Sequence, residues 1–197
     1  MKKFTAIALG AVMMAPLPAS AATFVVQALA NSSTGGTALS TVALAAGQAF
    51  TVTSSTNDLW SAGALPRFSD ANGLTGDRFA TAADDSGQAV GTQIGTNFGS
   101  YTQSGFTAPY GAMVGRINST YFLVGSAFAG VAATAGTLEL FYWDSNNGDN
   151  TGQISADVTA LAAAVPEAAT WSMLIAGFGL VGVSLRRRSA KLIKQMI

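Results

Sequence analysis

The chain contains no cysteine and no histidine. These absences exclude disulfides, thiol nucleophiles, Ser-His-Asp triads and metal sites with thiolate or imidazole ligands. Any bound metal must therefore be a hard cation held by oxygen atoms. Charged residues make up only 10% of the 197 residues, whereas Gly, Ala, Ser and Thr are abundant. This composition favours a β-rich surface protein over a helical enzyme.

Basic residues are scarce in the middle of the chain. Between Ala22 and Val165 there is no lysine, and three arginines face nine acidic residues, so this stretch has a net charge of −6. A surface that follows nucleic-acid phosphates needs the opposite sign. We therefore expect no nucleic-acid partner.

The N-terminal residues 1–21 have the pattern of a secretory signal peptide. Two lysines precede an apolar stretch from Phe4 to Ala15, and Ala19–Ala21 form a small-x-small cleavage site. A core helix or a membrane anchor is the alternative, but Pro16 and Pro18 end a helix and the apolar stretch is short for a bilayer. We expect cleavage after Ala21 and a secreted or cell-surface protein.

Residues 171–185 near the C-terminus carry no charge and predict a membrane-spanning helix. Fifteen helical residues rise only about 22 Å, against a hydrocarbon core of ~30 Å. Such a span crosses by thinning of the bilayer and by snorkelling of its flanking residues. The five cations that follow should remain cytoplasmic, which leaves the preceding chain outside. They are Arg186, Arg187, Arg188, Lys191 and Lys194.

The stretch from Val165 to Arg188 resembles a PEP-CTERM sorting tail of bacteria that make extracellular polysaccharide. The resemblance rests on Pro166 and Glu167, on Trp171 before the span, on the Gly-rich apolar helix and on the arginine cluster; Ala168 replaces the family's second proline. It implies an exosortase partner, a membrane protease that cuts near the motif and releases or transfers the exported part. A plain tail anchor is the alternative interpretation.

Residues 22–164 predict a single all-β domain, because short runs of alternating polarity are typical of strands. Gly- and Asn-rich breaks separate the runs, and no pattern indicates a long amphipathic helix. About eight strands predict an antiparallel β-sandwich or jelly roll. The residues expected to face the core are Phe50, Val52, Leu138, Leu140, Tyr142, Ile154, Ala156 and Val158.

Other positions of this domain carry more specific expectations. Asn118 and Ser119 should join two strands, and Arg116 should lie at a sheet edge or pair with an acid such as Glu139. Trp143 is expected to pack in the core. The region 70–106, rich in Gly, Thr and Asp, should form long loops and little core.

The most polar stretch of the chain, YWDSNNGDNTG, follows its most apolar strand. Five of its side chains offer carboxylate or amide oxygens, and Ca²⁺ takes six to eight oxygen ligands. An ordinary connecting loop is the alternative, since Asn, Asp and Gly also favour turns, and the spacing is not that of an EF-hand. The five are Asp144, Asn146, Asn147, Asp149 and Asn150.

The domain also resembles PA-IL-like bacterial lectins, which have a galactose-binding-domain-like β-sandwich. The resemblance is carried by the ordered segments GQAFTVTSSTNDLWSAG, APYGAMVGRI, YFLVGS, AGTLELFYWD and DNTGQISADV. It implies a calcium ion that holds a galactose-like sugar. The implied calcium ligands are Asp144, Asp149, Asn150 and a carbonyl near Gly63. The candidate sugar contacts are Asp144, Asn150 and Trp60, because an indole ring such as that of Trp60 is suited to stacking on a sugar. The loop from Asp144 to Asp149 is shorter here than in the lectin pattern.

The sequence thus favours an exported, non-catalytic surface or matrix protein whose partners are an exosortase, the membrane before processing, and galactose-like glycans or extracellular polysaccharide. A ligand-free structural domain is the first alternative. A glycoside hydrolase that uses Asp84 and Asp85 is the second, but no motif supports a reaction, and adjacent acids on a Gly-flanked loop are usually solvated.

Overall fold

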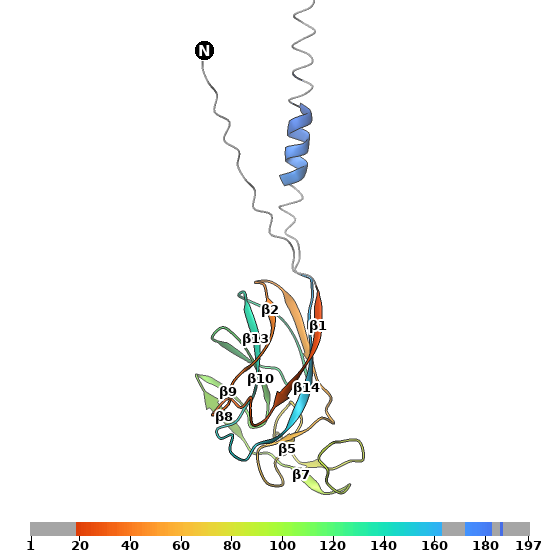
Figure 1. The fold of residues 1–197 in the computed structure, drawn as a ribbon, viewed down its shortest axis with the longest axis vertical. Coiled ribbons are helices and arrows are strands. Elements are labelled where there is room, and N and C mark those ends of the chain that lie inside the picture. Colours follow the sequence, from red (N-terminus) through yellow and green to blue (C-terminus); the bar gives the residue numbers. More distant parts are fainter. Residues whose placement is uncertain (1–18, 163–171, 183–185, 187–197) are drawn as a thin grey trace, which may run out of the picture. The chain divides into compact units, whose positions relative to one another are not determined.

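A computed structural model of the chain describes residues 19–162, 172–182 and 186. Fourteen strands lie between Ser20 and Ala160, and every strand pair is antiparallel (Figure 1). The strands are β1 (Ser20–Gln27), β2 (Leu39–Leu44), β3 (Ala49–Thr53), β4 (Trp60–Ser61), β5 (Phe68–Ser69), β6 (Arg78–Phe79), β7 (Gln93–Gly95), β8 (Ser100–Gln103), β9 (Phe106–Pro109), β10 (Met113–Ile117), β11 (Thr120–Leu123), β12 (Ala127–Val131), β13 (Gly136–Tyr142) and β14 (Thr151–Ala160).

Two larger sheets form the body of the domain. A six-stranded sheet has the order β12-β3-β14-β4-β5, with β1 also paired to β14, and a four-stranded sheet has the order β11-β10-β13-β2. The pairs β6-β7 and β8-β9 form two small additional sheets. The predicted antiparallel β-sandwich architecture is therefore observed.

The main core lies between the two larger sheets. Alternate residues of β3 and β14 meet alternate residues of β13 in one buried cluster, as the period-two pattern predicts. Burial of these apolar side chains drives the sheets together. The predicted inward residues Phe50, Val52, Leu138, Leu140, Tyr142, Ile154, Ala156 and Val158 all belong to this cluster, which confirms their assignment.

The outer face of the four-stranded sheet is covered as well. Trp143 is buried in a second cluster with Val114, Ala108 and Ala112, against which Tyr101 packs. The indole Nε1 of Trp143 donates to the Tyr101 carbonyl at 2.8 Å. Trp143 is thus a packing residue, as predicted.

The hairpin of β10 and β11 turns at Asn118, which has φ 54°, in the left-handed region that Asn tolerates better than most residues. Arg116 stands opposite Glu139 across β10 and β13, and their side chains form an ion pair with Nη2 2.7 Å from Oε2. The predicted turn and the predicted cross-strand pair are both confirmed.

Two fold predictions are wrong in detail. Seven strands have five or more residues, but seven shorter ones are also present, and runs of two to four residues are too short to show alternation. The region 70–106 contributes Leu74 to the main core, and Ala80 and Ile94 form a small buried cluster with Leu59. This region therefore holds more core than its composition predicts.

The predicted domain ends are only partly described. Strand β1 begins at Ser20, so the cleavage expected after Ala21 falls within its first residues, while residues 1–18 lie outside the described part. Contacts divide the chain into two units, Met1–Ala163 and Ala164–Ile197. The cleavage itself stays a prediction.

In the second unit, residues 172–182 form a helix whose side chains are exposed. Within the described residues, no helix has the length and apolar character needed to cross a membrane. The span predicted at 171–185 extends beyond those residues. The sorting residues Pro166, Glu167, Trp171, Arg187 and Arg188 also lie outside them, whereas Arg186 is described as helical and exposed.

Candidate functional site

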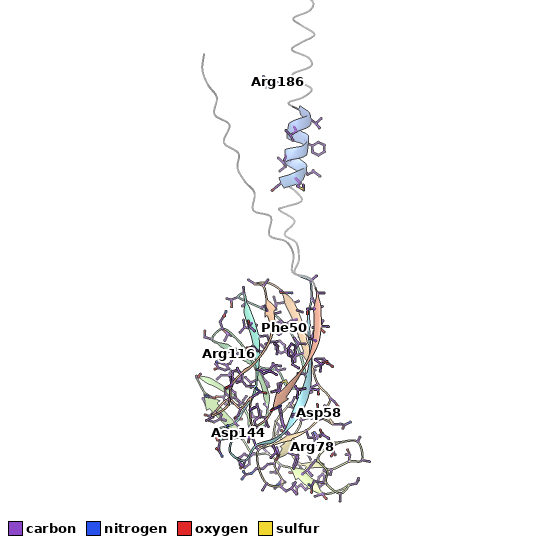
Figure 2. The ribbon with its side chains drawn as sticks, viewed as in Figure 1. Phe50, Asp58, Arg78, Arg116, Asp144 and Arg186 are labelled. Carbon is purple, nitrogen blue, oxygen red and sulfur yellow. The ribbon has the colours of Figure 1, made fainter. Side chains whose placement is uncertain are left out.

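The polar loop Asp144–Asn150 connects β13 to β14 and lies at one end of the sandwich (Figure 2). The register of β1 on β14 runs from Ser20 opposite Ala160 to Gln27 opposite Gln153. The loop is therefore at the start of β14, and the point where the chain leaves the domain is at the other end of that strand. Ten strand residues separate the two ends by roughly 30 Å.

Strand pairing brings Gly63 to this loop. The first residues of β14 pair with β4, with Thr151 opposite Ser61, so the chain after β4 passes the end of the loop. Gly63 has φ 116°, and a Cβ at this position would overlap the carboxylate of Asp149. Only glycine permits this approach.

Ser33 fixes the chain where it leaves β13. Its backbone N donates to the Tyr142 carbonyl at 2.8 Å. Its hydroxyl donates to the Asp144 carbonyl at 2.9 Å and accepts from the Asp144 backbone N at 3.1 Å. Because the main chain of Asp144 is held on both sides, its side chain is directed by the fold rather than by solvent.

The carboxylate of Asp144 is withdrawn from water, since the residue is only 5% exposed. This burial raises the pKa of Asp144, and the nearby charge of Asp149 acts in the same direction. Hydrogen bonds from the backbone of Ser145 and Asn146 and from the side chain of Asn150 offset part of the effect. The folded chain thus holds a partly desolvated negative charge here.

Two buried polar groups near this carboxylate lack partners. Asn150 is 3% exposed, and its Nδ2 donates to the Ala28 carbonyl at 3.4 Å, but its Oδ1 has no hydrogen-bond partner among the described residues. The hydroxyl of Tyr142 is likewise buried without a partner there. Burial raises the pKa of Tyr142 well above its usual range, and the charges of Asp144 and Asp149 contribute further.

These groups fit a hard divalent cation. Calcium prefers carboxylate, amide and carbonyl oxygens in irregular geometry. This end of the sandwich supplies two carboxylates and an amide oxygen that has no partner among the described residues. No group of three or more Asp, Glu, His or Cys suited to a metal occurs within the described residues. Neutral oxygens and a bound ligand would therefore have to complete the coordination.

The predicted carbonyl ligand at Gly63 already has one partner. Its oxygen accepts a hydrogen bond from the Ser61 hydroxyl at 2.6 Å. A carbonyl oxygen has a second lone pair, so ligation by Gly63 stays a prediction. The structure brings Gly63 and Asp149 together, and it brings Asp144 together with Asn150.

Asp149 lies on the open side of the loop, with a side chain that is 49% exposed. Its Oδ1 accepts from Asn146 Nδ2 at 3.2 Å, and its Oδ2 lies 3.7 Å from Arg67 Nη1. The sequence did not point to Arg67. The available signal was that Arg67 is one of only three basic residues in an acidic domain. Only the fold places it beside Asp149.

The prediction that Trp60 stacks on a sugar is wrong, because the residue is fully buried. Strand β4 lies inside the six-stranded sheet between β14 and β5. The indole Nε1 donates to the Gly111 carbonyl at 2.7 Å, and the ring meets Tyr142 edge-on at 4.7 Å. Trp60 therefore supports Tyr142 beneath the loop instead of contacting a ligand.

Asp84 and Asp85 do not form a pair with each other. Partial burial alone would raise the pKa of Asp84, but hydrogen bonds from Ser86 and Thr81 lower it to about 2. Asp85 accepts from the Leu59 backbone N at 2.8 Å, and burial together with neighbouring Asp58 raises its pKa. These acids hold loops together, and their arrangement gives no support for glycoside hydrolysis.

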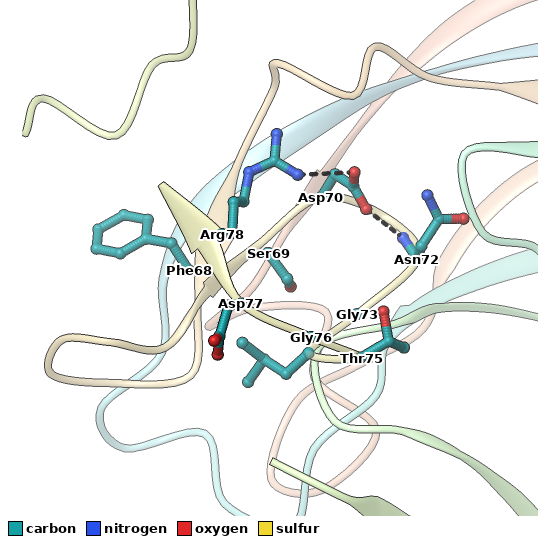
Figure 3. Close-up of a pocket in the computed structure, with 10 residues that line it drawn as sticks. Phe68, Ser69, Asp70, Asn72, Gly73, Thr75, Gly76, Asp77 and Arg78 are labelled. Carbon is teal, nitrogen blue, oxygen red and sulfur yellow. Dashed lines mark hydrogen bonds and ion pairs between the residues drawn. The ribbon is translucent and has the colours of Figure 1, made fainter. Parts of the chain in front are cut away.

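A separate cavity of about 200 Å³ is lined by the segment from Phe68 to Arg78 (Figure 3). Its buried acid, Asp70, accepts from Arg78 Nη1 at 2.9 Å and from the Asn72 backbone N at 2.8 Å. Asp77 accepts from the side chains of Gln93 and Thr96. The carboxylates of this cavity are thus satisfied within the protein.

Residues 164–188 match the family model of the PEP-CTERM protein-sorting motif. The chain carries a PEP-CTERM sorting motif. This motif is characteristic of exported, cell-surface proteins made as membrane-anchored precursors. The match covers the predicted tail and confirms that resemblance.

Among solved structures, the chain is similar to the N-terminal domain of EclA, described as a PllA-like lectin. The identity is 21%, the TM-score is 0.43, and the similarity covers 70% of this chain and 94% of that one. The expected likeness to a lectin domain is thus found. No curated protein matches the chain.

Proposed function

We propose that this chain is an exported β-sandwich protein that binds calcium and, through the ion, a carbohydrate. The observation that carries the proposal is the buried carboxylate of Asp144, which lies beside a buried amide whose Oδ1 has no partner in the part of the chain that the structure describes. In a protein without a ligand here, both features cost stability, because burial disfavours the charged carboxylate and an unpaired buried polar group costs about 1–3 kcal/mol. A cation bound by these oxygens would offset both costs.

Calcium suits these residues better than magnesium. Asp144 and Asp149 lie on a seven-residue loop, and Gly63 lies on a different segment, so the oxygens are not arranged as a compact octahedron. Magnesium demands near-ideal octahedral geometry and keeps its waters, whereas calcium tolerates six to eight ligands in flexible geometry. Asp144 and Asn150 would hold the ion from the buried side and Asp149 from the open side.

The exposed side of the loop supports a role in carbohydrate binding. Asp149 is half exposed, so the candidate site opens to solvent, and the protein oxygens named above number fewer than a calcium ion requires. Neighbouring hydroxyls of a sugar ring have the chemistry to complete such a set. The loop lies at the start of β14, and the chain leaves the domain at the other end of that strand. The loop therefore stays accessible after export.

The sorting tail supports the setting in which this binding takes place. We propose that an exosortase processes the chain near Pro166 and Glu167, and that the domain then meets extracellular polysaccharide or another galactose-like glycan. The arginines after the apolar helix would fix the orientation of the precursor.

A glycan array tests the binding proposal. The full chain, purified in a detergent without a sugar headgroup, is applied with calcium and with a chelator, beside Asp144→Asn and the matched control Asp157→Asn. Asp157 is an exposed acid on β14. We expect calcium-dependent binding by the parent and by Asp157→Asn, but none by Asp144→Asn. Equal binding in chelator would rule out the ion as the bridge, and absence of all binding would favour the ligand-free structural domain.

The sorting proposal is tested in cells. Replacement of Arg186, Arg187 and Arg188 by Ser should impair retention or sorting of the precursor, because the positive charges that set its topology are removed. Localisation and mature mass report the outcome. If both are unchanged, the arginines do not take part in sorting.

A further inference from the structure

The acidic domain uses its three arginines in different ways. Arg116 lies 2.7 Å from the carboxylate of Glu139, and Arg78 lies 2.9 Å from that of Asp70. Arg67 approaches Asp149 only to 3.7 Å, beyond hydrogen-bond distance, and its side chain is 38% exposed. Arg67 is therefore the cation of this domain whose charge is least committed within the fold.

Arg67 is nevertheless held in place. Its Nη1 donates to the Ala62 carbonyl at 3.3 Å, and its guanidinium lies over the ring of Phe98, 4.6 Å from the centroid. Phe98 is itself packed edge-on against Tyr110 at 5.2 Å. Among the described residues, stacking on the ring and one hydrogen bond leave other N–H groups of the guanidinium unused. Arg67 therefore presents an oriented donor fork at the open side of the loop.

The net charge around the loop changes sign if calcium binds. Without the ion, Asp144 and Asp149 carry two negative charges against the one positive charge of Arg67. A divalent cation neutralises the two carboxylates, and the charge of Arg67 is then unbalanced. A site with a net charge of about +1, beside an exposed guanidinium, favours a ligand that brings a negative group of its own.

We propose that Arg67 selects sugars that carry a carboxylate, so that the ligand of this domain is an acidic sugar of the hexuronic acid class. The inference rests on the proposed calcium and carbohydrate site. The ion holds sugar hydroxyls, while Arg67, released from Asp149 and steadied by Phe98, donates to the sugar carboxylate. Arginine is suited to this task because its planar fork matches the two carboxylate oxygens.

Calorimetry of the full chain in calcium tests the proposal, with galactose and galacturonate as probes. The two sugars differ in the group at C6, which is a hydroxymethyl in one and a carboxylate in the other. We expect galacturonate to bind at least about tenfold more tightly to the parent, since charge-assisted hydrogen bonds are the stronger kind. Arg67→Gln should lose this preference and keep its affinity for galactose, and Arg67→Lys should retain part of it.

Phe98→Ala should weaken the preference because the guanidinium loses its support, whereas Phe79→Ala, which removes another exposed phenylalanine, should leave it unchanged. Sodium acetate is the control for a plain anion. If Arg67→Gln keeps the preference, if the parent binds both sugars alike, or if acetate competes as well as galacturonate does, the role of Arg67 is overturned and the proposed function stands. If neither sugar binds in calcium while calcium itself binds, the carbohydrate function fails together with this inference.

Discussion

The loop around Asp84 and the loop around Asp144 have similar compositions, yet their carboxylates are in opposite situations. Asp84 accepts hydrogen bonds from the backbone and hydroxyl groups of Thr81 and Ser86, and its pKa falls to about 2. Asp144 is buried, its pKa is raised, and two nearby polar groups, on Asn150 and Tyr142, lack partners among the residues that the structure describes. The carboxylate of Asp84 thus receives its hydrogen bonds from its own loop, whereas polar groups beside Asp144 have no partner within the described residues.

The difference shows what separates a turn from a candidate site. Asp, Ser and Gly are turn formers in both loops, so composition does not distinguish them. What distinguishes them is whether each buried oxygen has a donor, because native proteins rarely leave buried polar groups unpaired. The following predictions test that distinction, from the largest expected effect to the smallest.

Calcium should stabilise the parent and not Asp144→Asn. At a free concentration about a hundredfold above Kd, a ligand that binds only the folded state adds roughly 2.7 kcal/mol, which raises the Tm of a domain of this size by about 5–10 °C. Asp144→Asn keeps the shape of the side chain and removes its charge. Thermal unfolding in calcium and in chelator measures the effect, with magnesium as the control ion.

The same series tests whether the calcium response depends on the Asp144 loop. Asp157→Asn should keep the full calcium response, since Asp157 lies on β14 away from the loop. A calcium response that survives in Asp144→Asn would mean that the ion binds elsewhere.

Asp84→Ala should destabilise the chain by about 1 kcal/mol, because it removes the acceptor for several local hydrogen bonds. Its calcium response should match that of the parent. Urea unfolding in chelator measures the first effect and the calcium shift measures the second. If the calcium response were lost, the loop around Asp84 would have to be reconsidered as part of the site.

The two carboxylates should also give opposite pH dependences. The folded pKa of Asp84 lies below its ordinary value of 3.8, so its stabilisation is present above about pH 4 and is lost as the pH falls towards 2. The folded pKa of Asp144 is raised, so the ion-free chain loses stability as the pH rises from the ordinary value through the raised one. Carboxyl NMR titration in chelator checks both directions, and a pKa of Asp144 at or below its ordinary value would contradict the account.

Tyr142→Phe should give the smallest effect. It deletes a buried hydroxyl that has no partner among the described residues, so the stability of the ion-free chain should be unchanged or rise by up to about 1 kcal/mol. The matched change Tyr101→Phe removes a hydroxyl that lies 3.1 Å from Thr34 Oγ1 and should cost about 1 kcal/mol. Equal losses in both variants would show that Tyr142 is not an unpartnered group.

Much of the fold follows from local sequence pattern. Alternation in β3, β13 and β14 is enough to identify the inward residues, because each strand is long enough to show two or more repeats. The pattern fails for β4 to β7, which have two or three residues each. Trp60 was misjudged for the same reason, since a two-residue strand does not reveal that it lies inside a sheet.

The candidate site was only partly accessible from sequence. Asp144, Asp149 and Asn150 are neighbours in one loop, and their oxygens stand out by composition. Tyr142 looks like an ordinary core residue, and only its unpaired hydroxyl in the fold links it to the site. Arg67 and Phe98 are far from the loop in sequence. Arg67 comes to Asp149 because β4 pairs with the start of β14, and Phe98 lies against the guanidinium of Arg67. No local pattern predicts either contact.

The most direct test of the central claim is calorimetric titration of calcium into the full chain after removal of divalent ions. The account predicts binding of one calcium ion per chain at the Asp144 loop, tighter than magnesium, and loss of this binding in Asp144→Asn but not in Asp157→Asn. The absence of calcium binding by the parent, or equal binding by Asp144→Asn, would contradict it.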